Sequence, residues 1–313
     1  MKQLKRAGYT LLSLVLLLNF IAAFHAWKFT HFYDDAHHIN KRPEQMSVGE
    51  KMQIVLLGVR ISKYVIRHQP EVPFETISLY TADSLRLEGW WIPVSQAKGT
   101  VILFHGYNGG KDGTLAEAAY FRQLGYNTFL LDFRASGNSE GHTCSIGYYE
   151  KEEVKLAYDY VQRRTPQPVI LWGMSMGAAA VLHAVSSYGL QPQKVILECP
   201  YATLVDAVKS RMRSVHLPGT PLSQLLTFWG GLEQGFWGFS LKPALYARDM
   251  HMPVLYFWGK QDIRVMPHET QEIYANIASK DKTLYVLENA GHESFCKKAP
   301  EVWKPAVKQF MDK

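Results

Sequence analysis

The sequence has few cysteines and no clustered metal ligands. Cys144, Cys199 and Cys296 are the only three in 313 residues, and they lie far apart. Because there is no C-x-x-C pair and no Cys/His cluster, the sequence predicts no metal site. The odd count leaves at least one thiol free. A single disulfide stays open, so cysteine usage does not decide the redox compartment.

Dense runs of Lys and Arg are also missing beyond the N-terminus, although the formal net charge is +6. Nucleic-acid binding is therefore not expected. The sequence contains no internal repeats and no low-complexity segments. Its hydrophobic content of 47% and charged content of 20% are ordinary for a globular protein, and a chain of this length can bury one large core or two modest ones.

Charge is absent from residues 7–27, a run of 21 residues that is rich in leucine. About 20 helical residues cross the roughly 30 Å hydrocarbon core of a bilayer. Three basic residues precede the run and only Lys28 directly follows it, which favours a cytoplasmic N-terminus. We therefore expect residues 1–33 to form a single-pass signal-anchor, with the rest of the chain on the non-cytoplasmic side of the membrane.

Two other interpretations of this segment stay open. Cleavage as a signal peptide requires small residues before the cut, and Ile21-Ala22-Ala23 is only a fair match. Cleavage would give a secreted or periplasmic protein. The length of the apolar run favours the anchor over cleavage, and a buried core helix is the least favoured of the three.

Residues 34–74 are expected to form a helical connector. Apolar residues between Met46 and Arg67 recur close to a 3.6-residue period on a wide stripe, which predicts a well-covered helix that ends before Pro70 and Pro73.

From residue 75 onward, short apolar runs alternate with amphipathic segments, which predicts parallel βα units with helices on both faces of the sheet. We expect eight strands, the first two as a hairpin, at residues 77–80, 85–94, 100–104, 127–133, 169–172, 194–198, 254–258 and 283–287. Helices are expected at residues 115–124, 149–164, 176–188, 268–279 and 300–310.

One pentapeptide carries the strongest chemical signal. Gly173-Met174-Ser175-Met176-Gly177 follows a predicted strand and precedes a predicted helix. Strand, G-x-S-x-G and helix in this order form the context of a nucleophile elbow, in which a tight turn projects the serine hydroxyl. The sequence therefore predicts Ser175 as a nucleophile.

A serine hydroxyl is a weak nucleophile, so it needs a histidine base that a carboxylate orients. Asp262 and His292 each lie on a short loop after a later predicted strand. The order Ser175, Asp262, His292 is that of the α/β-hydrolase fold. Glu198 and Glu288 are alternative acids. Asp262 is favoured over both because of the length of the loop that carries it.

The oxyanion that forms during acyl transfer needs fixed N–H donors. One predicted donor is the backbone amide of Met176, directly after the nucleophile. The other is the amide of Tyr107, on the loop after the strand at residues 100–104. The side chain of His105 is expected to hydrogen-bond within that loop rather than act as a second base.

A long insertion at about residues 200–250 interrupts the alternation of strands and helices. It is rich in Leu, Phe and Trp, and insertions of this length are uncommon unless they are functional. Two interpretations stand equal: a small helical cap over Ser175 that forms an apolar acyl pocket, or surface helices packed on the sheet by the same aromatic residues.

These residues together resemble the α/β-hydrolase superfamily over residues 75–313. Residues 131–141 are similar to the pattern D-x-R-G-x-G-x-S-x-G, with Ala135 in place of a glycine, and residues 197–201 are similar to L-E-S-P-F. These motifs are typical of the serine aminopeptidase-like and monoacylglycerol lipase-like branch, which includes single-pass membrane-anchored hydrolases. The resemblance implies hydrolase chemistry without a cofactor, on esters, thioesters, lipids or peptides.

The sequence as a whole therefore predicts a membrane-anchored serine hydrolase that cleaves a carboxylic ester, with a lipid or thioester included, through an acyl-enzyme. A peptidase would need an acidic clamp for a substrate amine, and Glu233 is the one obvious candidate. A catalytically silent scaffold at the membrane and a cofactor-free perhydrolase are the remaining alternatives.

Overall fold

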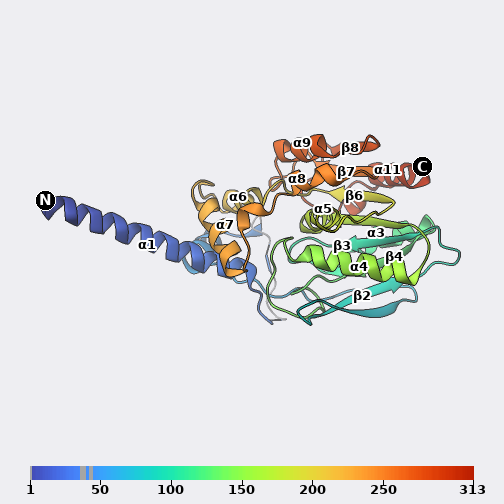
Figure 1. Cartoon of the computed structure of the whole chain (residues 1–313), viewed down its shortest axis with the longest axis horizontal. Coiled ribbons are helices and arrows are strands. Elements are labelled where there is room, and N and C mark those ends of the chain that lie inside the picture. The colour runs from blue at the N-terminus through green and yellow to red at the C-terminus, as the bar shows by residue number, and fades with distance from the viewer. Residues whose placement is uncertain (1, 36–39, 42–44) are drawn as a thin grey trace.

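The computed structural model describes residues 2–35, 40–41 and 45–313, which form an α/β domain with one long helix projecting from it (Figure 1). Its sheet has eight strands in the order β1-β2-β4-β3-β5-β6-β7-β8. Their bounds are β1 (Glu75–Tyr80), β2 (Arg86–Ile92), β3 (Thr100–Phe104), β4 (Asn127–Leu131), β5 (Val169–Met174), β6 (Lys194–Glu198), β7 (Val254–Gly259) and β8 (Lys282–Leu287).

The first two strands pair antiparallel, and β2 also pairs antiparallel with β4, whereas every pair from β4 across to β8 is parallel. The predicted hairpin and the mostly parallel eight-stranded sheet are thus confirmed. Strands β3, β4 and β6 are buried at every residue. This full burial explains why their sequences show no alternation of polar and apolar residues.

Helices cover both faces of this sheet. Side chains of α4 (Glu150–Arg164), α5 (Met176–Tyr188) and α9 (Pro267–Asn276) join the core on one face. Side chains of α3 (Leu115–Gln123) and α11 (Pro300–Asp312) join the core on the other. The short α10 (Phe295–Lys298) precedes α11, and 3-10 turns lie at Lys111–Thr114, Gly238–Ser240 and Ala247–Asp249. The structure therefore has the α/β-hydrolase fold.

The insertion forms a helical cap. It contains α6 (Leu204–Ser214), α7 (Leu222–Glu233) and the short α8 (Pro243–Tyr246). Helix α7 packs against α6 and against the C-terminal part of α1 (Lys2–Thr30), as Figure 1 shows where the blue and orange helices meet. The insertion is thus helical, and α7 packs against the long apolar helix.

Among the described helices, the projecting α1 is long and apolar enough to cross a membrane, with a mean hydropathy of 2.0 in an 18-residue window within Gln3–Thr30. Most of its large apolar side chains from Leu4 to Leu17 are exposed. The C-terminal part is different, because Ala22 and Ala26 are buried against the domain.

The connector departs from the prediction. Its helix α2 covers only Val48–Leu57, with a capping box made by Ser47 and Glu50, and none of its residues is buried. The expected helix beyond Leu57 and its expected burial are both wrong. Gly58 ends the helix with φ of 75° and ψ of 162°, and the chain then runs extended through Ile61, which is buried in the core. Residues 36–39 and 42–44 of the predicted connector lie outside the described residues.

Candidate active site

The turn between β5 and α5 holds Ser175 in a strained conformation, with φ of 54° and ψ of −116°. A side chain at either flanking glycine would clash. A Cβ at Gly177 would lie 2.3 Å from the carbonyl oxygen of Phe104, and one at Gly173 would lie 2.7 Å from the amide nitrogen of Ala178. Glycine at both positions therefore lets the turn close tightly against β3 and α5.

The structure brings together the three side chains that the sequence singled out. The Nε2 atom of His292 lies 2.8 Å from the Oγ atom of Ser175, and its Nδ1 atom lies 2.7 Å from Oδ2 of Asp262. The other carboxylate oxygen of Asp262 accepts hydrogen bonds from the backbone amides of Arg264 and Val265, at 2.7 and 2.9 Å. The three groups form one hydrogen-bonded chain from the hydroxyl to a fixed carboxylate.

Neither alternative acid contacts the histidine. The Oε1 atom of Glu198 accepts hydrogen bonds from the indole nitrogens of Trp172 and Trp303, at 3.0 and 2.7 Å. Glu288 lies on the surface, where it pairs with Lys260. The geometry thus favours Asp262 as the partner of His292.

The electrostatics of Asp262 suit an orienting carboxylate. Burial alone would raise the pKa of this carboxyl, but the neighbouring His292 and the two backbone amides lower it below its ordinary value. An ionised Asp262 favours a proton on Nδ1 of the imidazole. The Nε2 atom is then free to accept the proton of Ser175.

The sequence predicts the backbone amides of Met176 and Tyr107 as oxyanion donors, and both residues lie close to Ser175 in the chain or in the cleft. Met176 is the first residue of α5, so its amide belongs to the N-terminal turn, where backbone N–H groups have no partner within the helix. Tyr107 lies beside Ser175 in the cleft, and a Cβ at Gly106 would lie 3.4 Å from Cβ of Ser175. The loop after β3 therefore approaches Ser175 closely at Gly106.

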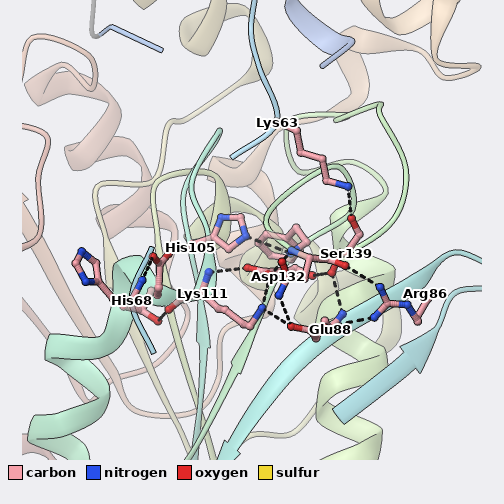
Figure 2. A network of polar contacts seen from close by, with 12 residues as sticks. Lys63, His68, Arg86, Glu88, His105, Lys111, Asp132 and Ser139 are labelled. Carbon is pink, nitrogen blue, oxygen red and sulfur yellow. Dashed lines mark hydrogen bonds and ion pairs between the residues drawn. The ribbon is translucent and has the colours of Figure 1, made fainter. Parts of the chain in front are cut away.

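A buried ionic network supports that loop (Figure 2). Lys111 is fully buried, and its Nζ atom lies 2.5 Å from Asp132 and 3.0 Å from Glu88. The backbone amide of Lys111 also donates to Asp132, at 2.7 Å. His105 accepts from the amide of Phe133 at 3.1 Å through Nε2, while its Nδ1 lies 2.7 Å from the carbonyl oxygen of Gly106. The structure thus places the His105 side chain within this support.

The sequence reasoning missed Lys111 and Glu88, although Asp132 belongs to the motif that it recognised. Two positions of the same motif are conformationally demanding. Ala135, the departure from glycine, adopts a φ of 58°. A Cβ at Gly137 would lie 2.1 Å from Oδ2 of Asp132, so only glycine leaves room for the carboxylate.

Ser175 and His292 open into a cleft of about 1280 Å³. The domain supplies one wall through the loop after β3, and the cap supplies another through α6 and α7. The remaining wall comes from α1 and α2, with Leu18, Ile21 and Phe29 of α1 among its residues. The sequence analysis did not predict that α1 lines the cleft, because a leucine-rich run indicates only that the segment itself is buried or inserted in a membrane.

One group of described residues has the donor atoms of a metal site. Potential ligand atoms of Cys199, Asp262 and His292 all lie within 4.8 Å of one another. Burial raises the pKa of the Cys199 thiol well above its ordinary value, so it remains protonated, and the other two side chains already bond each other. This chemistry suits proton transfer better than metal binding. All three cysteines of the chain are free and buried.

Comparisons with known proteins agree with the fold. Residues 95–227 match the family described as serine aminopeptidase, S33. The alpha/beta hydrolase domain-containing protein WAV2 of Arabidopsis thaliana is 25% identical over 276 residues, which cover 83% of this chain and 85% of the relative. The lysophosphatidylserine lipase ABHD12 of Danio rerio is 26% identical over 208 residues, which cover 62% of this chain and 51% of that protein.

Among solved structures, the esterase Pf2001 of Pyrococcus furiosus superposes with a TM-score of 0.66 and 22% identity, over 80% of this chain and 97% of the esterase. The chain therefore has the fold of the α/β-hydrolases, and its residues 95–227 match a family of that fold.

Proposed function

We propose that this protein is a serine hydrolase that cleaves a carboxylic ester through an acyl-enzyme. The observation that carries the proposal is the unbroken chain of hydrogen bonds from Ser175 through His292 to Asp262. In this mechanism the Oγ atom of Ser175 attacks the ester carbonyl while His292 takes its proton and passes it to the leaving alcohol. Water, activated by the same imidazole, then releases the acyl group as an acid and restores the serine.

The amides of Met176 and Tyr107 would hold the oxyanion of each tetrahedral intermediate. A single donor of this kind lowers the barrier by about 2.7 to 4 kcal/mol in other serine hydrolases. The fixed loop after β3 supports this role, because an amide that is held in place before the reaction needs no reorganisation during it.

An amphiphilic acyl ester fits the cleft. Apolar side chains of α1, α2 and α7 are among the residues that line it, which suits an acyl chain. Among the described residues, nine Lys and Arg side chains and three carboxylates line the cleft, which favours a substrate with an acidic group. A lipid ester is also the kind of substrate that the name of the Danio rerio relative states for that protein.

A peptidase of the same fold is the second candidate, since the matched family is described as serine aminopeptidase. The excess of cations in the cleft disfavours binding of a substrate ammonium group. Glu233, the expected clamp, is exposed and is not among the residues that line the cleft. We therefore rank an ester above an amide.

The N-terminal helix is proposed to remain attached as a membrane anchor. The indole nitrogen of Trp229 in the cap donates to Oδ1 of Asn19 at 3.1 Å, and Ala22 is buried against the domain. Cleavage after Ala23 would remove both contacts. The basic residues that precede the apolar run favour placing the domain on the non-cytoplasmic side.

A fluorophosphonate probe tests the proposed chemistry. The membrane-extracted protein should label covalently, and Ser175→Ala should abolish labelling and ester turnover. Ser95→Ala, the same change at an exposed loop serine, is the matched control and should behave as the parent. A folded protein that does not label would instead favour the silent scaffold. A series of p-nitrophenyl esters of increasing chain length would then define the acyl preference.

A further inference from the structure

Helix α2 carries an apolar stripe that no other described part of the chain covers. Val48, Met52 and Leu56 are 82%, 55% and 69% exposed. Their spacing of four residues places them on one face of the helix. A contiguous exposed apolar face on a short helix is the pattern of an element that lies in a membrane interface or against a partner.

The position of α2 beside α1 favours a membrane interface over a partner protein as the surface that covers the stripe. A Cβ at Gly58, directly after α2, would lie 2.9 Å from Cγ of Lys28 and 3.1 Å from Cε1 of Phe24. The C-terminal end of α2 therefore contacts α1 within the last two turns of the long helix. An element fixed at this point sits where α1 would leave the bilayer.

The length of α1 sets the depth of this contact. Residues 7–17, which project beyond the domain, are about 17 Å long at 1.5 Å per residue, whereas the hydrocarbon core is roughly 30 Å thick. The remaining distance of about 13 Å must therefore be spanned by residues 18–27. That segment is the one that packs against the cap and α2, through the contacts of Asn19 with Trp229 and of Phe24 with the end of α2.

These same helices line the cleft that holds Ser175 and His292. Their apolar contribution comes from Leu18, Ile21, Ile54, Leu57, Leu222 and Leu226. An acyl chain placed between these helices would thus reach the nucleophile without passing through water.

We propose that α2 lies in the membrane interface with its stripe in the lipid, and that the cleft opens sideways into the bilayer between α1 and α2. The substrate is then an acyl ester that already resides in the membrane, and α1 is a wall of its binding site as well as an anchor. The statement about the substrate rests on the proposed hydrolase function, whereas the placement of α2 does not.

The placement of α2 is tested without catalysis. Met52→Cys in the full chain, labelled with an environment-sensitive fluorophore and reconstituted in phosphatidylglycerol and phosphatidylcholine vesicles, should be quenched by lipids that carry a nitroxide on the acyl chain. Val302→Cys on α11, also an exposed apolar position, is the matched control and should be quenched only by aqueous iodide. The three native cysteines are buried, so the label should report the introduced thiol. Quenching of the Met52 label by iodide alone would overturn the proposal.

The entry route is tested by turnover. Leu56→Glu places a charge on the stripe at a residue that does not line the cleft. It should lower turnover of a monoacyl ester embedded in vesicles at least tenfold and leave turnover of a soluble short-chain ester unchanged. Val302→Glu should change neither. Equal effects of Leu56→Glu on both substrates, or no effect on either, would refute sideways entry. An inactive parent protein would refute the hydrolase function instead, while the quenching result would still decide where α2 lies.

Discussion

The hydroxyl of Tyr107 donates a hydrogen bond to the backbone carbonyl of Phe29, 2.5 Å away. One partner lies on the loop proposed to supply an oxyanion donor, and the other lies in the last turn of α1. The ring of Tyr107 also packs edge-on against Phe32, just beyond that helix. The apolar helix is thus tied directly to the loop that faces the nucleophile.

Replacing this hydroxyl should weaken the proposed active site without dismantling it. Tyr107→Phe keeps the ring but removes a hydrogen bond whose net contribution is about 0.5–1.5 kcal/mol, so kcat should fall by about 2- to 10-fold. Steady-state kinetics on a soluble ester would measure the change. Tyr80→Phe, at an exposed position on β1, is the control and should leave kcat unchanged. An unaltered kcat in Tyr107→Phe would show that the loop holds its position without α1.

Loss of the Asp262 carboxylate should lower kcat far more than loss of the Tyr107 hydroxyl. Asp262→Asn keeps the shape of the side chain but favours the imidazole tautomer that cannot accept the serine proton, and in comparable triads this costs about 10⁴-fold in kcat. The rate of fluorophosphonate labelling should fall in parallel. Asp281→Asn, a surface carboxylate paired with Lys313, is the matched control. Activity within tenfold of the parent would mean that another group orients His292.

Glu198 should make stability depend on pH. Burial raises the pKa of this carboxyl from 4.5 to about 8, with the charge of Glu117 acting in the same direction. The unfolded chain then loses its proton at a lower pH than the folded protein does. Stability should therefore be fully retained below pH 4.5 and should decline as the pH rises towards 8.

The variant Glu198→Gln should remove this decline, because an amide oxygen can still accept from Trp172 and Trp303 without ionising. The expected gain in stability is on the order of 2 kcal/mol at pH 8 and close to zero at pH 4.5. Thermal unfolding in detergent at the two pH values would measure it as a pH-dependent rise in Tm. Glu288→Gln, on the surface, should give no such difference. A gain of equal size at both pH values would contradict the assignment.

Local patterns were enough to predict the sheet, because each strand is a short apolar run between turn residues. The predicted β3, β6 and α5 match the observed bounds residue for residue. The order of Ser175, Asp262 and His292 along the chain also pointed to the cluster that the structure brings together. Parallel strands place their carboxyl ends at one edge, so this convergence follows from the topology.

The predictions that were wrong or missing depend on tertiary contacts, which no local sequence pattern indicates. The apolar period continues past Leu57, but Gly58 turns the chain and Ile61 is buried by tertiary packing rather than by a helix. The sequence around Lys111 is typical of a solvated lysine on a glycine-rich loop, yet its charge is balanced by Asp132, directly after β4, and by Glu88, within β2. Neither partner is close to it in the sequence.

The bond between Asn19 and Trp229 has a practical consequence for anyone who prepares this protein. Membrane-anchored enzymes are often trimmed of their hydrophobic leader to obtain a soluble sample for crystallisation. Here a truncation at residue 30 would strip α7 of the helix on which it rests, and would expose Gly230 where Ala26 now packs. A shortened protein would therefore lack the wall that α1 contributes to the cleft around Ser175 and His292, and a substrate screen on it would not represent the intact chain.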